Sequence, residues 1–174
     1  MDGRQRSRAG FTIVELLIVI VVIGILAAIT IVAYSGIQSR AQQTKIQNDL
    51  TELTQAIAAA RTQTGQTLWQ ITGGPGVTAD ACGQYANGTD LAALPKTDFC
   101  WTKYSDTLSK ISNAGGVNIR NLVDPWQRPY WIYENEGRLT PTTCSQDTIA
   151  SFKNPHVMWG NDNLRYVANS LVNC

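Results

Sequence analysis

A single carboxylate, Glu15, interrupts the long apolar run that begins at Phe11. The run extends to Val32, and its other polar residues are Thr12 and Thr30. Burying a carboxylate in a helix surrounded by hydrocarbon costs on the order of 2.5 kcal/mol or more, so such a group usually has a partner or a function. Glu15 is therefore the first residue for which we expect a specific role.

Four cysteines form a second set of reactive side chains: Cys82, Cys100, Cys144 and Cys174. All of them follow the apolar run, and an even number in an exported domain indicates disulfides, for which three connectivities exist. Proximity in the sequence favours Cys82–Cys100 and Cys144–Cys174. The first bridge would stabilise the fold by about 3 kcal/mol in the chain-entropy model. The second would tie the last residue back to the fold.

The sequence offers little to a metal ion or a catalytic reaction. His156 is the one histidine and no Cys-x-x-Cys pair is present, so a zinc site is not expected. A serine or cysteine nucleophile would depend on this histidine, which lies in an expected strand. The glycines of 73–76 include a proline and no lysine, unlike a phosphate-binding loop. We expect no catalytic residue, no metal and no cofactor.

The charges indicate a nearly neutral protein. Lysine and arginine total 14, and aspartate and glutamate total 13; without residues 1–10, 11 basic and 12 acidic residues remain. The sequence has no basic cluster of the kind that would indicate a nucleic-acid partner. Arg4, Arg6 and Arg8 precede the apolar run, which favours a cytoplasmic N-terminus and an exported remainder.

The run from Phe11 to Val32 is long enough to span a bilayer, which takes roughly 20 apolar residues. An ordinary secretory signal peptide usually has an apolar centre of about 7–15 residues and no carboxylate, although Ala27-Ala28 would suit its cleavage site. A plain membrane anchor explains the length and the preceding arginines. It gives Glu15 no role.

A helical pattern continues beyond the span. Apolar residues recur at spacings of three and four, as on one face of a helix, at Ile46, Leu50, Leu53, Ile57 and Ala60. The polar residues between them are expected in solvent: Gln47, Asn48, Asp49, Glu52 and Gln55. No proline interrupts the chain from Phe11 to Arg61, and Gly65 is the expected stop. We therefore expect one helix of about 50 residues, roughly 75–80 Å long.

From Thr64 onward, short elements alternate with turn residues. A helix is expected over Trp101–Ser112, with Tyr104, Leu108 and Ile111 on one side and Gly115-Gly116 after it. Strands are expected over 130–133, 156–159 and 165–167, and turns at 73–76 and 87–88. The predicted class is α+β, with a small antiparallel sheet packed on the apolar stripe of the long helix.

A small residue, an aromatic residue and a glutamate four positions later follow the basic leader. They lie in the stretch Gly10-Phe11-Thr12-Ile13-Val14-Glu15-Leu16-Leu17, which continues through Gly24-Ile25-Leu26-Ala27-Ala28-Ile29. This stretch resembles the N-terminal signature shared by type IV pilins and the pseudopilins of type II secretion. The family commonly has proline near the end of the span, where this chain has Val32, so the helix lacks that breaker.

The resemblance implies a processing and assembly chemistry. A prepilin peptidase cuts between Gly10 and Phe11 and methylates the new amine of Phe11. Glu15 then pairs with that amine, in its own or an adjacent subunit, and the pairing sets the register of subunits in a filament.

A second stretch, Asp124-Pro125-Trp126-Gln127-Arg128-Pro129-Tyr130, resembles the Asp-Pro-Trp-Gly-x-Pro-Tyr segment of major pseudopilins, with Gln127 in place of glycine. Asp124 before proline starts a turn, Trp126 is expected in the core, and Pro129 sets the entry to an edge strand. Those pseudopilins carry calcium in a later loop. Here 160–163 offers only one carboxylate, so a solvated turn is expected instead.

Three functions follow from these patterns. The first is a structural subunit of a type IV pilus, which serves adhesion, twitching motility or DNA uptake. The second is a pseudopilin of a type II secretion system, and the third is a membrane-tethered binding module. The expected organisation is a cleaved leader (1–10), a transmembrane and polymerisation helix (11–32), its amphipathic continuation (33–63) and a head with two disulfides (64–174).

The expected partners are other copies of this chain through their N-terminal helices, the prepilin peptidase, the pilus assembly machinery and, before assembly, membrane lipid. The precursor is expected in the cytoplasmic membrane and the assembled subunit in a filament at the cell surface.

Overall fold

The computed structural model describes residues 10, 12–73, 78–86, 89–134, 147–152 and 164–169, the last of these as backbone only. The elements, in chain order, are α1 (Ile13–Thr64), α2 (Leu68–Thr72), α3 (Thr78–Gly83), α4 (Phe99–Gly115), β1 (Trp131–Tyr133), β2 (Thr148–Phe152) and β3 (Leu164–Asn169). The chain divides into two compact units, Met1–Ala41 and Gln42–Cys174, and α1 contributes to both.

Helix α1 is one uninterrupted helix of 52 residues. It passes through Val32 without a break, as expected from the absence of proline at that position. It ends where predicted, because Gly65 adopts a left-handed conformation with φ of 67° and its N–H donates to the Arg61 carbonyl at 2.8 Å.

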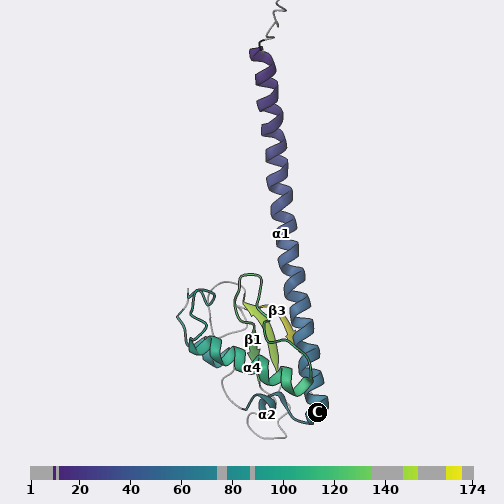
Figure 1. Cartoon of the computed structure of the whole chain (residues 1–174), viewed down its shortest axis with the longest axis vertical. Helices are drawn as coiled ribbons and strands as arrows, with labels where there is room; N and C mark the ends of the chain where they lie inside the picture. Colours follow the sequence, from purple (N-terminus) through teal and green to yellow (C-terminus); the bar gives the residue numbers. More distant parts are fainter. Residues whose placement is uncertain are drawn as a thin grey trace, which may run out of the picture. The chain divides into compact units, whose positions relative to one another are not determined.

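The predicted apolar stripe of α1 forms the core of the second unit. Its five members are all buried: Ile46, Leu50, Leu53, Ile57 and Ala60. They pack with side chains of α4 and of the sheet, namely Tyr104, Leu108, Ile111, Ile132 and Ile149. Figure 1 shows α4 and the sheet beside the C-terminal part of α1. The predicted α+β class, a long helix packed against a head with a small antiparallel sheet, is confirmed.

One residue between the stripe positions departs from the prediction. Asp49 was expected in solvent, but only 8% of its surface is exposed. The segment that precedes β1 covers this part of α1 and brings the Tyr130 hydroxyl to the Asp49 carboxylate. The prediction for Asp49 is therefore wrong, because a distant segment supplies a hydrogen bond that helix periodicity cannot reveal.

Helix α4 is longer than predicted at both ends. Asp98 is its N-cap, accepting from the Cys100 N–H at 2.9 Å, and Gly116 closes it in a left-handed conformation. Tyr104, Leu108 and Ile111 are buried on one side, as predicted. Gly115 lies against α1 so closely that a Cβ at this position would be 2.9 Å from the Ala56 carbonyl oxygen.

The sheet is antiparallel in the order β1-β2-β3, so β1 is an edge strand of the described sheet. In β1 and β2, Trp131 pairs with Ala150 and Tyr133 with Thr148. The expected strands at 130–133 and 165–167 correspond to β1 and β3. The expected strand at 156–159 lies outside the described residues, and β2 was not anticipated.

Candidate processing and assembly site

A reciprocal pair of hydrogen bonds starts the apolar helix. Thr12 precedes the first helical residue, and its hydroxyl oxygen accepts from the Glu15 N–H at 3.2 Å. The Glu15 carboxylate in turn accepts from the Thr12 N–H and the Thr12 hydroxyl, both at 2.8 Å. This is a capping box, which satisfies N–H groups that have no partner within the helix.

The capping box gives Glu15 a partner within its own chain. The assembly role predicted for Glu15 involves the amine of Phe11, and Thr12 is a partner that this prediction does not include. The spacing Thr-x-x-Glu before an apolar run is a recognised sign of a helix start and was readable from the sequence. Phe11 itself lies outside the described residues, so its amine remains a predicted partner only.

Gly10, the predicted last residue of the leader, is exposed. A Cβ built on it meets no heavy atom within 4 Å. A larger side chain at this position therefore meets no obstacle within the described part of the chain. Any requirement for glycine here belongs to the processing enzyme and stays a prediction.

The helix beyond Glu15 presents an apolar surface in its own unit. Its large apolar side chains from Ile13 to Ile31, and those of Tyr34 and Ile37, are about half exposed or more. Helix α1 is long and apolar enough to cross a membrane by length and composition, and its most apolar part is not buried within the described part of the chain. Thr30 donates its hydroxyl to the Leu26 carbonyl at 2.7 Å, so its polar group is satisfied within the helix.

In the head, Cys82 of α3 and Cys100 of α4 form a disulfide, the pairing that proximity favoured. Next to it, the Tyr85 hydroxyl donates to Asp98 at 2.5 Å, and this bond raises the pKa of Tyr85 to about 12. Asp98 thus caps α4 and also fixes Tyr85 on the disulfide-closed loop. Cys144 and Cys174 lie outside the described residues.

The stretch that resembles pseudopilins forms a tight turn around Asp124, which is buried. Its carboxylate accepts from the Trp126 and Arg128 N–H groups at 2.9 and 2.8 Å, and it forms an ion pair with the Arg128 guanidinium at 2.7 Å. The predicted turn start at Asp124 is therefore confirmed. Gln127 has φ of 64°, a conformation that favours glycine, the residue at this place in the pseudopilin pattern.

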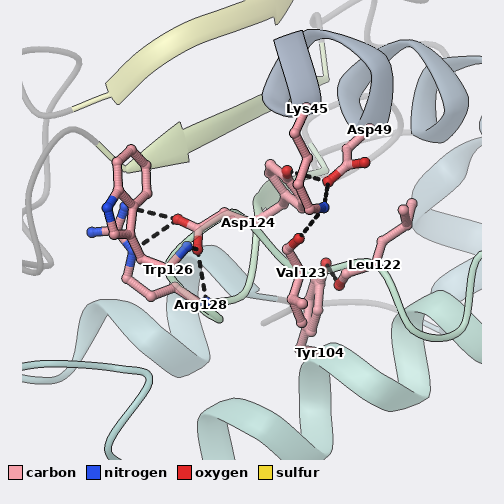
Figure 2. Close-up of polar contacts among 9 residues, drawn as sticks. Lys45, Asp49, Tyr104, Leu122, Val123, Asp124, Trp126 and Arg128 are labelled. Carbon is pink, nitrogen blue, oxygen red and sulfur yellow. Dashed lines mark hydrogen bonds and ion pairs between the residues drawn. The ribbon is translucent and has the colours of Figure 1, made fainter. Parts of the chain in front are cut away.

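Trp126 does not occupy the core, contrary to the prediction. It is 39% exposed, and its ring faces the Arg128 guanidinium carbon at 4.8 Å from the ring centre (Figure 2). The turn directs this side chain outward because its own N–H is held by Asp124. The core positions of this segment are taken by Tyr130 and Ile132.

Polar contacts fasten this turn to α1 (Figure 2). The Lys45 ammonium donates to the Val123 carbonyl at 2.8 Å and to Asp49 at 2.5 Å. The Tyr130 hydroxyl donates to the same Asp49 oxygen at 2.5 Å. Burial and this bond hold the pKa of Tyr130 far above its usual value, so the phenol stays a donor at all ordinary pH values.

Within the described residues, no three histidine, cysteine, aspartate or glutamate side chains gather as metal ligands. Residues 160–163, weighed above for calcium, lie outside the described residues.

Comparisons with known proteins find a described sequence motif at the start of α1. Residues 5–31 match the family model of the prokaryotic N-terminal methylation motif. Over 56 residues, or 32% of this chain, the sequence is 44% identical to the type IV major alpha-pilin of Moraxella bovis and 44% identical to fimbrial protein Q of the same organism. No solved structure matches this chain.

These matches cover 35% and 36% of the two relatives, so the chain spans about a third of their length. Both relatives carry the names of pilus or fimbrial proteins. The resemblance read from the first residues is confirmed: this chain carries the N-terminal methylation motif of prepilins and is a distant homologue of type IV pilins.

Proposed function

We propose that this protein is the structural subunit of a type IV pilus. A prepilin peptidase cleaves it between Gly10 and Phe11 and methylates Phe11. The assembly machinery then moves the mature subunit from the cytoplasmic membrane into a filament at the cell surface, which serves adhesion, motility or DNA uptake.

The exposed apolar surface of Ile13–Ile37 is the observation that carries this proposal. A surface of this size is unfavourable in water. Lipid tails and the helices of other copies are similarly apolar, so exchange between them is governed by packing and by polar groups. The same helix therefore suits storage in the membrane and a filament core.

Glu15 is the polar group that steers the exchange in this proposal. In the membrane, its carboxylate is satisfied by Thr12. In the filament, the charged amine of Phe11, from its own or an adjacent subunit, becomes its partner. Removing one member of a buried charged pair typically costs about 3–5 kcal/mol.

We predict that Glu15→Leu enters the membrane and is processed normally but assembles few or no filaments. Processing is measured by mass spectrometry of the membrane fraction and assembly by electron microscopy of sheared surface material. Glu52→Gln, which neutralises an exposed glutamate of α1 in the other unit, is the matched control and should assemble normally. Normal filaments from Glu15→Leu would remove Glu15 from the assembly mechanism.

A pseudopilin of type II secretion is the second candidate. The turn at Asp124 favours it, with Gln127 in a conformation suited to the glycine of the pseudopilin pattern. Long surface fibres whose main subunit begins at Phe11 support the pilus. An absence of surface fibres, together with loss of protein secretion when the gene is deleted, supports the pseudopilin instead.

A membrane-tethered binding module is a third outcome of the same experiments. It requires that Glu15→Leu cells bind their ligand as well as wild-type cells while no filament forms from either. A mature chain that begins after Ala28 would contradict all three proposals, because the apolar helix would then be a discarded signal peptide.

A further inference from the structure

Two carboxyl groups face each other at one end of the β1–β2 pair. Tyr133 pairs with Thr148, so the next residues outward on the two strands, Glu134 and Asp147, lie opposite each other. Both are buried, with 3% and 1% of their surface exposed. Strand alternation places them on the same face as the core residues Ile132 and Ile149.

Few positive charges face this pair among the described residues. From α1, the Arg61 guanidinium forms a buried ion pair with Asp147. From α3, Asp80 adds a third carboxyl group that interacts with Glu134. From α2, Thr72 presents its hydroxyl to Glu134, and the Lys110 ammonium of α4 donates to the Thr72 carbonyl at 2.6 Å.

Two carboxyl oxygens of this group lack a hydrogen-bond partner among the described residues. Glu134 Oε1 and Asp80 Oδ1 are buried and have no hydrogen-bond partner within the described part of the chain. Like charges directly opposite each other on paired strands are destabilising, and a buried charge is costly unless it is paired. The carboxyl group of Glu134 interacts with those of Asp147 and Asp80, and Arg61 is paired with Asp147, so the group favours one bound proton.

Glu134 is the group that holds this proton. Burial first, and then the negative charges of Asp147 and Asp80, raise the pKa of Glu134 to about 8, although the Thr72 hydroxyl acts in the opposite direction. The Asp147 carboxylate forms its ion pair with Arg61. At neutral pH the pair is thus one carboxylic acid beside one carboxylate.

We propose that Glu134 and Asp147 form a proton-dependent latch in the head. With the proton on Glu134, the latch holds the ends of β1 and β2 together against the C-terminal part of α1. Loss of that proton places two negative charges opposite each other in the core, and this end of the strand pair then opens to admit water. The latch depends on the head alone and does not require the proposed filament function.

Hydrogen exchange of the full chain in detergent micelles, from about pH 5 to about pH 9, tests the latch. A group that binds its proton more tightly in the closed state makes closure weaker as pH rises. After correction for intrinsic exchange, the opening equilibrium of β1 and β2 should rise by up to about tenfold per pH unit between about pH 5 and pH 8. Peptides from α4 give the internal reference.

Glu134→Gln, which has nearly the same shape and no charge, should remove this pH dependence. Glu52→Gln, the matched exposed variant, should keep it. An equal pH dependence in wild-type protein and Glu134→Gln would overturn the proposal.

A second measurement covers the case in which Glu134→Gln does not fold. In wild-type protein labelled with ¹³C at glutamate carboxyl groups, one resonance should titrate with a midpoint at about 8. Titration of every glutamate near the ordinary value of 4.5 would equally overturn the latch.

Discussion

At the scale of single residues, the assembly role proposed for Glu15 requires its carboxylate to exchange the Thr12 hydrogen bonds for another partner. In the isolated chain the carboxylate completes the capping box, and its charge lies at the positive end of the helix dipole. In the proposed filament, pairing of Glu15 with the amine of Phe11 would replace these hydrogen bonds. We therefore expect Thr12 to influence the free energy of the proposed assembly step.

Thr12→Ala should separate helix capping from charge pairing. Loss of an N-cap hydroxyl typically costs about 1 kcal/mol, so the first turn of α1 should fray while Glu15 keeps its charge. We expect normal membrane insertion with a reduced yield of filaments, measured by quantitative immunoblot of sheared fibres. Thr12→Ser should restore the yield, because serine caps equally well.

Thr30→Ala is the control within the same apolar segment. The Thr30 hydroxyl bonds only back to the Leu26 carbonyl among the described contacts, so its loss should not alter assembly. Equal yields from Thr12→Ala and wild-type cells would show that the capping box plays no part in assembly.

At the scale of elements, the approach of α4 to α1 depends on Gly115. A Cβ there would lie 2.9 Å from the Ala56 carbonyl oxygen and 3.1 Å from the Ala60 amide nitrogen. Both are backbone atoms of a core helix, so neither can move without shifting α1. Glycine at this position thus permits the close contact between α4 and α1, although glycine itself lowers the stability of a helix.

Gly115→Ala should therefore destabilise the head, although alanine in a free helix is favoured over glycine by about 1 kcal/mol. Overpacking typically costs about 1–3 kcal/mol, which outweighs the gain in propensity. Urea unfolding followed by tryptophan fluorescence measures the change. Ser105→Ala, at an exposed position of α4, should be neutral; unchanged or increased stability in Gly115→Ala would contradict the close contact.

The sequence predicted those elements whose signal is local. The α1 stripe and the buried side of α4 follow from helical spacing, and the Gly65 stop follows from its conformation. Two capping boxes were equally local but overlooked: Thr12 with Glu15 at α1, and Thr67 with Gln70 at α2. Both motifs could have placed the helix starts.

Other features depend on contacts between distant segments, and no local pattern announces them. Asp49 is buried because Tyr130, far along the chain, donates to it. Glu134 and Asp147 meet only through the register of β1 and β2. Trp126 has a large aromatic side chain of the kind usually found in a core. In this turn, where its backbone N–H donates to Asp124, the side chain is partly exposed.

At the scale of the whole molecule, the boundary between the two units lies within α1. The predicted head (64–174) is preceded by an amphipathic helix (33–63) that is expected to bury its apolar stripe against it. The compact unit begins at Gln42 and includes that stripe. A head without residues 42–63 lacks the buried apolar side chains that α1 contributes to its core. The C-terminal part of α1 therefore belongs to the head energetically, whatever its role elsewhere.

A chain that begins at Gln42 should fold in water without detergent and unfold cooperatively in urea. It keeps the α1 stripe and the polar contacts of Lys45 and Asp49, and it lacks the apolar surface that needs lipid. A chain that begins at Thr51 should not fold. It loses Ile46 and Leu50, each worth about 1.5–3 kcal/mol when buried, and it leaves the buried Tyr130 hydroxyl without its acceptor, at a further cost of about 1–3 kcal/mol.

These losses reach the total stability of a typical domain, about 5–15 kcal/mol. Circular dichroism during urea unfolding, with both chains oxidised to form the Cys82–Cys100 bridge, compares them directly. Cooperative unfolding of the chain that begins at Thr51 would show that residues 42–50 are dispensable for the head. Cooperative unfolding of one that begins at Thr64 would place the start of the head at that residue. Failure of the Gln42 chain to fold, with the longer chain stable in detergent, would instead show that the head depends on the apolar half of α1.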